Sequence, residues 1–172
     1  MGRTVGLQLA ALILAVAVLA GCDGMDSRPA SAAALERIND PTTLQRGKNL
    51  YSQHCATCHG TQREGADHWH QRNPDGTRPP PPLDGSAHTW HHPYWQLKDM
   101  IQFGSGARGG VMPGFEDSLS EGEVEAVIAW LQSHWPAEIL EAWQRYDDNL
   151  PTQGAWEAAT GEMWMTQPEA AD

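Results

Sequence analysis

The chain has 172 residues, with 22 Asp and Glu against 11 Lys and Arg, and its formal net charge is −11. A protein this acidic is repelled by phosphate backbones, which excludes nucleic acid as a partner. The length fits one domain with additional segments at its ends.

A leader is predicted over residues 1–21. Val5–Leu19 is a mostly apolar run that follows a single cation, Arg3. Such a run is typical of the hydrophobic region of a signal peptide and is short for a membrane span. Leu19-Ala20-Gly21-Cys22 resembles the bacterial lipobox, which implies cleavage before Cys22 and lipidation of its thiol. An ordinary cleaved signal peptide and an uncleaved anchor are the alternatives.

The lipobox places the protein outside the cytoplasm, on the periplasmic side of the bacterial inner membrane and anchored by lipid. Among bacterial lipoproteins, an Asp directly after the Cys, here Asp23, often marks retention at that membrane. A soluble periplasmic protein is the alternative. Residues 22–41 are rich in Ala, Ser, Pro and charge and show no apolar periodicity, so we expect a lipidated N-terminus followed by a flexible tether.

A helix is expected over residues 42–54, because Leu44, Leu50 and Tyr51 recur at helical spacing. Gly47 lies inside this helix, where Gly costs about 1 kcal/mol relative to Ala. The close approach of a second helix would account for a glycine at this position.

Cys55-Ala56-Thr57-Cys58-His59 is a C-x-x-C-H motif, the signature of covalent haem c attachment. Two thiols about one helical turn apart can add to the two vinyl groups on one porphyrin edge, and the His59 imidazole can then bind the iron. A C-x-x-C pair alone also occurs in redox-active and zinc-binding sites. The export signal favours haem, so we expect one covalent haem c held by Cys55, Cys58 and His59.

The second axial ligand is expected to be a methionine, since a Met sulfur opposite His raises the reduction potential and suits electron transfer. Met100 and Met112 are the methionines inside the predicted domain. Met100 lies on a short helical pattern between Pro93 and Gly104, where Met usually packs in the core; we expect it to line the haem crevice. Met112 lies in an irregular, glycine-rich loop that would let the backbone approach the porphyrin, and it is the predicted ligand.

Five histidines lie within a stretch of 25 positions; they are His68, His70, His88, His91 and His92. Histidine is the commonest ligand of transition metals in proteins, so a copper or zinc site is one interpretation. The expected one is a solvated loop that faces partner proteins.

The most regular helical pattern follows Ser120, which forms a capping box with Glu123 and precedes an apolar stripe; the stripe consists of Val124, Val127, Ile128 and Leu131. Pro136 ends this helix. Residues 136–172 are expected to contain a short helix, over Ala137–Tyr146, and an acidic tail that carries Trp156, Trp164 and Met165. Docking of this tail on the domain or a partner and a disordered terminus are both possible.

These features resemble class I c-type cytochromes. Gly47, Tyr51 and Cys55 keep the spacing of the family's N-terminal helix, and Val127 and Trp130 match the positions at which its C-terminal helix crosses that helix. The resemblance implies an all-α class I cytochrome c fold, in which N- and C-terminal helices cross around one covalently bound haem, with long loops.

The resemblance covers roughly residues 42–135, the predicted cytochrome domain. Pro81-Pro82-Leu83-Asp84-Gly85 resembles the family's Pro-x-Leu-x-Gly stretch, which implies that the Pro81 carbonyl holds the ring nitrogen of His59. Met112-Pro113 resembles the motif of the family's axial methionine. With Cys22 assigned to lipid and two cysteines to haem, no pair is left for a disulfide.

The expected function is that of a membrane-tethered monohaem cytochrome c, which transfers single electrons between extracytoplasmic redox partner proteins in a respiratory chain. We expect a monomer or a complex subunit. We expect no enzyme, since the iron of the single haem is expected to have no open position and no catalytic motif of hydrolases or nucleotide-binding proteins appears. The alternatives are the cytochrome subunit of a larger dehydrogenase or oxidase complex and a haem protein of copper handling.

Overall fold

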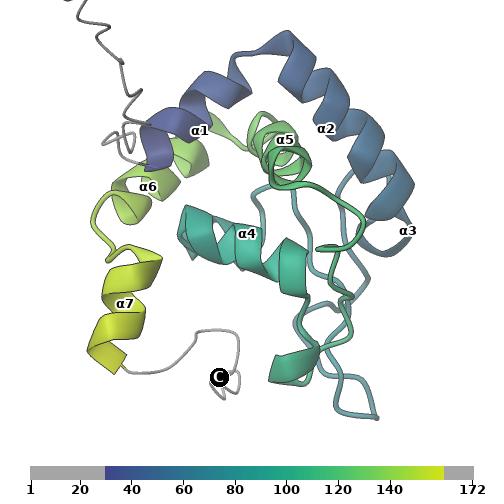
Figure 1. The fold of residues 1–172 in the computed structure, drawn as a ribbon. Coiled ribbons are helices and arrows are strands. Elements are labelled where there is room, and N and C mark those ends of the chain that lie inside the picture. Colours follow the sequence, from purple (N-terminus) through teal and green to yellow (C-terminus); the bar gives the residue numbers. More distant parts are fainter. Residues whose placement is uncertain (1–29, 161–172) are drawn as a thin grey trace, which may run out of the picture.

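The computed structural model describes residues 30–160. In this range the chain forms seven α-helices and two short 3₁₀ helices, and it contains no β-strand (Figure 1). The helices are α1 (Ala30–Ile38), α2 (Pro41–His54), α3 (Ala56–His59), η1 (His88–His91), α4 (Tyr94–Phe103), η2 (Gly106–Arg108), α5 (Glu121–Gln132), α6 (Ala137–Asp147) and α7 (Gln153–Thr160). The expected all-α class is confirmed, and the arrangement is consistent with a class I cytochrome c fold.

Helices α2 and α5 cross at Gly47, as the glycine inside the helix expected over residues 42–54 predicted (Figure 1). A Cβ atom on Gly47 would lie 2.0 Å from the carbonyl oxygen of Ala126 and 2.7 Å from Cβ of Trp130. The absence of a side chain therefore allows the two backbones to meet. Beside the crossing, the rings of Tyr51 and Trp130 lie 4.7 Å apart, and both residues belong to the hydrophobic core.

Local signals account for the start of both crossing helices. The Asp40 carboxylate caps α2 by accepting from the backbone N–H groups of Thr42 and Thr43. Ser120 and Glu123 form the predicted capping box at the start of α5. The apolar stripe of α5 is buried, and the helix ends at Gln132, four residues before Pro136.

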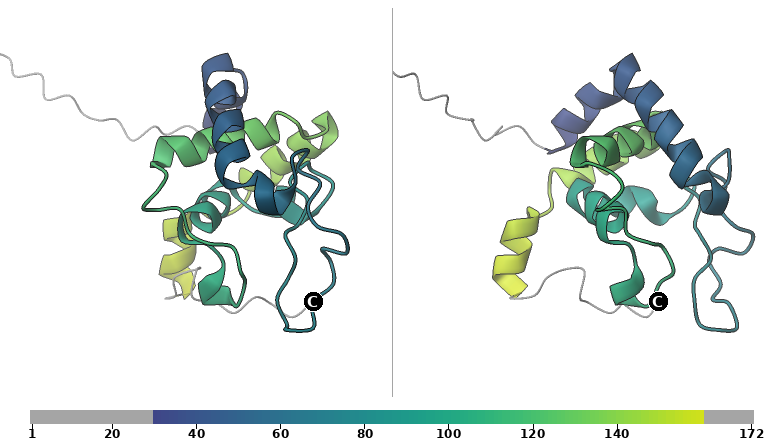
Figure 2. Two further views of the ribbon diagram at one scale, coloured as in Figure 1. Left: turned by 90° about the vertical axis from the view of Figure 1, so that its right-hand side faces the viewer. Right: turned by 45° about the vertical axis from the view of Figure 1, so that its right-hand side comes forward.

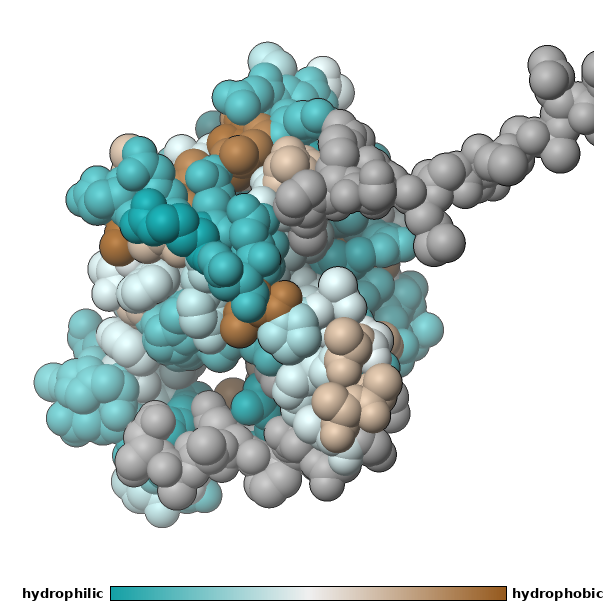
Figure 3. All heavy atoms as spheres, turned by 90° about the vertical axis from the view of Figure 1, so that its left-hand side faces the viewer, coloured by the Kyte–Doolittle hydropathy of each residue, from teal (hydrophilic) through white to brown (hydrophobic). Residues whose placement is uncertain are grey.

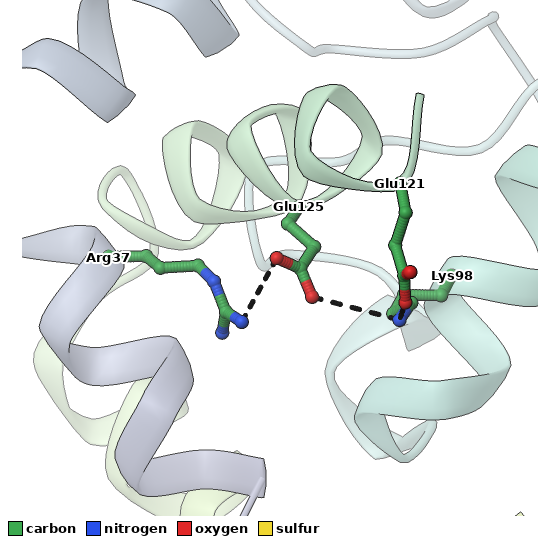
Figure 4. A network of polar contacts seen from close by, with 4 residues as sticks. All are labelled: Arg37, Lys98, Glu121 and Glu125. Carbon is green, nitrogen blue, oxygen red and sulfur yellow. Dashed lines mark hydrogen bonds and ion pairs between the residues drawn. The ribbon is translucent and has the colours of Figure 1, made fainter. Parts of the chain in front are cut away.

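A chain of charged side chains joins α1 and α4 to α5 (Figure 4). Glu125 of α5 accepts from Arg37 of α1, with 3.0 Å between Nη2 and Oε2, and its other oxygen lies 3.7 Å from Nζ of Lys98 on α4. Lys98 also pairs with Glu121 at the start of α5. Partly exposed pairs of this kind contribute little stability singly. Together they orient three helices around one carboxylate.

The expected flexible tether over residues 22–41 is wrong for residues 30–38, which form α1. Ser31 and Ala34 of α1 are buried, and the guanidinium of Arg37 lies 5.6 Å from the ring centre of Tyr94. Small side chains bring α1 close to its neighbours, and this packing stabilises a segment whose composition resembles a linker. The leader, Cys22 and the rest of the predicted tether lie outside the described residues.

The segment after α5 contributes to the core. Trp143 of α6 is fully buried, and its Nε1–H donates to the carbonyl oxygen of His92 over 3.0 Å. Further along, α7 contacts α4, because the rings of Trp156 and Trp95 lie 6.3 Å apart and Trp95 Nε1 donates to Pro151. Up to residue 160 the tail thus docks on the domain as a helix, while Trp164 and Met165 lie outside the described residues.

Two parts project from the crossing helices. Helix α7 lies on one side, and the long loop between α3 and η1 lies on the other (Figure 2). The face formed by α1, α6 and α7 is mainly hydrophilic, with hydrophobic residues in small, separate patches (Figure 3). Among residues 30–160, none of the helices has the length and apolar character needed to cross a membrane.

Candidate functional site

The C-x-x-C-H motif occupies a single helical turn at the end of α2. The backbone N–H of Cys55 donates to Tyr51 and so continues α2, and α3 follows at once with the N–H of His59 bonded to the Cys55 carbonyl. Cys55 is half-buried, Cys58 is exposed, and His59 is buried. The turn therefore carries one exposed and one partly buried thiol and directs the imidazole inward.

The thiol of Cys55 lies in a partly buried environment. Burial, together with the neighbouring Cys58, raises the pKa of the Cys55 thiol to about 11. The Cys55 thiol is therefore protonated at neutral pH.

The His59 imidazole is held by the segment that the family resemblance pointed to. Its Nδ1 lies 2.9 Å from the carbonyl oxygen of Pro81. Burial lowers the pKa of His59, and this bond acts in the opposite direction. An imidazole whose Nδ1 is bonded to a carbonyl has its Nε2 left to bind a metal, which is the arrangement common to metal-bound histidines.

Sequence reasoning missed two residues that support the Pro81–Gly85 segment. The backbone N–H of Leu83 donates to the carbonyl oxygen of Arg63 over 2.8 Å. The Leu83 carbonyl oxygen accepts from Nε1 of Trp135 over 3.1 Å. No local pattern marks Arg63, whereas a tryptophan between the end of the helix and Pro136 was a visible but unused signal.

The loop that carries Met112 is fixed to the end of α4. The Met112 N–H donates to the Ser105 hydroxyl, and the Ser105 N–H donates to the Met112 carbonyl, both over 3.0 Å. Gly104 has a φ of 73°, and a Cβ there would lie 2.4 Å from the Met112 carbonyl oxygen. The Met112 side chain is half-buried and packs against the core. Only a glycine allows this loop to approach the helix so closely.

The donor set fits a covalently attached haem. It comprises two thiols on one turn, an inward imidazole with Nε2 left to bind, and a thioether on a loop from a different part of the chain that two hydrogen bonds hold to Ser105. Met100, the other methionine of the predicted domain, lies on α4 and is also half-buried. The roles of Cys55, Cys58, His59 and Met112 as haem-binding residues, and the choice of Met112 over Met100, stay predictions.

The histidine-rich stretch forms a cluster of rings. The ring centres of His88, His91 and His92 lie 4.9–5.6 Å apart, and Trp69 stacks on His88 at 5.5 Å. Burial lowers the pKa of His92 to about 4. Within residues 30–160, no group of three or more His, Cys, Asp or Glu side chains is arranged to hold a metal ion. A second metal site stays a hypothesis.

Comparison with known proteins adds one finding. The family model described as cytochrome c oxidase, cbb3-type, subunit III matches residues 42–131, more than half of the chain. The match begins at the start of α2, ends in α5, and includes every residue predicted to bind haem. Neither the curated proteins nor the solved structures contain a match.

Proposed function

The chain belongs to the family of cytochrome c oxidase, cbb3-type, subunit III, a family of c-type cytochromes with covalent haem c, and we propose that it is a membrane-tethered monohaem carrier. In this role it moves single electrons between extracytoplasmic redox proteins of a respiratory chain. The bound haem supplies an iron that accepts and releases one electron.

The observation that carries the proposal is the environment of the His59 imidazole. Its ring is buried, its Nδ1 is bonded to Pro81, and Nε2 is the nitrogen left for the iron. The Met112 loop is fixed by two hydrogen bonds to Ser105. We infer that His59 and Met112 form the axial pair. Residues held by hydrogen bonds in this way suit electron transfer, because the protein then has little to reorganise when the charge of the iron changes.

Optical spectra of the purified holoprotein test the axial pair. We expect a low-spin spectrum with the weak far-red band of a sulfur-to-ferric-iron bond in the wild type. Met112→Ala should lose this band and gain affinity for carbon monoxide. Met100→Ala is the matched control, because it truncates the same side chain on α4 and should keep the band.

Two results would contradict the proposal. A wild type that lacks the band and binds carbon monoxide has an open axial position, which would favour ligand sensing or catalysis. Loss of the band in Met100→Ala but not in Met112→Ala would transfer the axial role to α4.

We also propose that Cys22 carries the lipid that holds the protein at the periplasmic side of the inner membrane. The support is the apolar run of residues 5–19 and the lipobox-like Leu19–Cys22 sequence. Growth with a labelled fatty acid should label the wild type, and Cys22→Ser should lose the label. A wild type that lies in the membrane without the label would instead indicate an uncleaved anchor.

A second candidate is the cytochrome subunit of a larger oxidase complex, which the printed description of the family favours. A haem-stained native gel of mildly solubilised membranes separates the two. The full chain has a mass of 18.9 kDa, and removal of the leader lowers it. A carrier should migrate near this lower mass, with haem, lipid and detergent added, and a subunit should migrate with a much larger complex.

A further inference from the structure

Arg63 occupies a backbone conformation that side chains normally avoid. Its φ is 67°, and His68, with a φ of 56°, is the other non-glycine residue of this kind among residues 30–160. Strained backbone of this type concentrates at functional sites, where the surroundings enforce it. Arg63 lies in the loop directly after the C-x-x-C-H motif, so the contacts of its side chain are of interest.

The Arg63 side chain is turned onto α5. Its guanidinium carbon lies 4.9 Å from the ring centre of Trp130. Its Nε is buried and has no hydrogen-bond acceptor within the described range. A guanidinium over the face of a tryptophan is held by cation–π attraction. The loop is thereby attached to the helix that forms the core of the domain.

The Arg63 backbone is connected to the ligand histidine by two routes. The loop closes on the motif itself, because the N–H of Gly65 donates to the His59 carbonyl over 2.9 Å. The Arg63 carbonyl accepts from the N–H of Leu83, two residues after Pro81, whose own carbonyl faces Nδ1 of His59. One short segment therefore joins Arg63 to the imidazole.

Trp135 holds the same segment from the other side. Its Nε1 donates to the carbonyl of Leu83, so both backbone groups of Leu83 are bonded. Trp130 and Trp135 lie within and just after α5. The position of the Pro81 carbonyl is thus set by two tryptophans of one helical region, and Arg63 makes one of the two connections.

We propose that Arg63 is a positioning residue for His59: its stacking on Trp130 fixes the loop of residues 60–65, and through Leu83 it keeps the Pro81 carbonyl on Nδ1 of the imidazole. The proposal rests on the proposed role of His59 as haem ligand. A carbonyl on Nδ1 makes an imidazole a stronger donor, which favours the oxidised iron. Release of this contact should therefore raise the reduction potential.

The test compares Arg63→Gly with His68→Gly in the haem-loaded protein. Glycine adopts a positive φ freely, so both variants relieve the same kind of backbone strain and should fold. Only Arg63→Gly removes a side chain that contacts α5. His68 is exposed in the same long loop, which makes it the matched control.

The measured quantities are the exchange rate of the His59 Nδ1 proton, followed by NMR, and the reduction potential. In Arg63→Gly we expect exchange about tenfold faster, as for the loss of one ordinary hydrogen bond, and a higher potential. In His68→Gly we expect wild-type values for both.

Equal exchange rates in the two variants would overturn the proposal, because Arg63 would then have no role beyond its position in the turn. A lower potential with unchanged exchange would also overturn it, because Arg63 would then act only through its charge. The wild-type spectrum is recorded first: if His59 is not a ligand, the spectrum shows this before any variant is compared. That result would refute the proposed function and not the role of Arg63.

Discussion

Replacement of Gly47 by alanine tests the helix crossing on which the fold depends. By helix propensity alone, the change should stabilise α2 by about 1 kcal/mol. The added Cβ would lie 2.0 Å from the carbonyl oxygen of Ala126, which is backbone and cannot rotate away. The helices must therefore separate, and the contact between Tyr51 and Trp130 at 4.7 Å loosens.

The size of the effect follows from these opposing contributions. Overpacking against rigid backbone costs about 3 kcal/mol, the upper part of the usual range. After subtraction of the propensity gain, the free energy of unfolding should fall by about 2 kcal/mol, a change of about 30-fold in the ratio of folded to unfolded protein. Chemical unfolding of the holoprotein, followed by far-UV circular dichroism, measures this difference.

Gly122 provides the matched control. It lies in the first turn of α5, and a Cβ there would meet no atom within 4 Å. Gly122→Ala should therefore be neutral or stabilise the protein by up to about 1 kcal/mol. If Gly47→Ala is as stable as Gly122→Ala, the close crossing described above is refuted.

The remaining predictions concern burial, pH and the methionine loop. Burial and a neighbouring carboxylate raise the pKa of Asp99 to about 6. Folding therefore favours the protonated form of Asp99, and this group increases the free energy of unfolding as the pH falls from about 7 to about 4. Asp99→Asn should remove that gain in urea unfolding at the two pH values; an unchanged gain would assign it to other groups. Trp143→Ala should cost about 4 kcal/mol in the same assay and the partly exposed Trp156→Ala about 1 kcal/mol, and equal losses would contradict the difference in burial. Ser105→Ala removes the acceptor of the Met112 N–H. In a titration toward alkaline pH, the midpoint at which the far-red band is lost should therefore fall by roughly 0.7 pH units. An unshifted midpoint would show that this bond does not hold the loop.

The elements that could be predicted from the sequence are those encoded by neighbouring residues. The capping box of Ser120 and Glu123 and the apolar stripe after it act within one helix, so a period and a cap were enough to place α5. The C-x-x-C-H motif likewise carries its chemistry in five consecutive residues. Gly47 also predicted a contact between distant segments, since a glycine in a helix interior indicates the close approach of a second helix.

The rest depends on contacts between residues far apart in the sequence. Helix α1 has the composition of a tether, and what stabilises it is the burial of Ser31 and Ala34 against other elements. The support of the Pro81–Gly85 segment joins Leu83 to Trp135, 52 residues later. Sequence periodicity reports one face of one element, so it contains no information on which distant residue will supply a hydrogen bond.

The docking of α1 also changes how far the domain can travel if Cys22 is anchored as proposed. A flexible chain from Cys22 to the start of α2 at Pro41 would span up to about 65 Å, whereas the eight steps between consecutive Cα atoms from Cys22 to Ala30 span at most about 28 Å. The volume available to the domain scales with the cube of this reach, so it shrinks roughly tenfold. The local concentration of haem at the membrane surface rises by the same factor. If Cys22 carries the proposed lipid, the nine-residue helix α1 therefore favours electron exchange with partners on the same membrane.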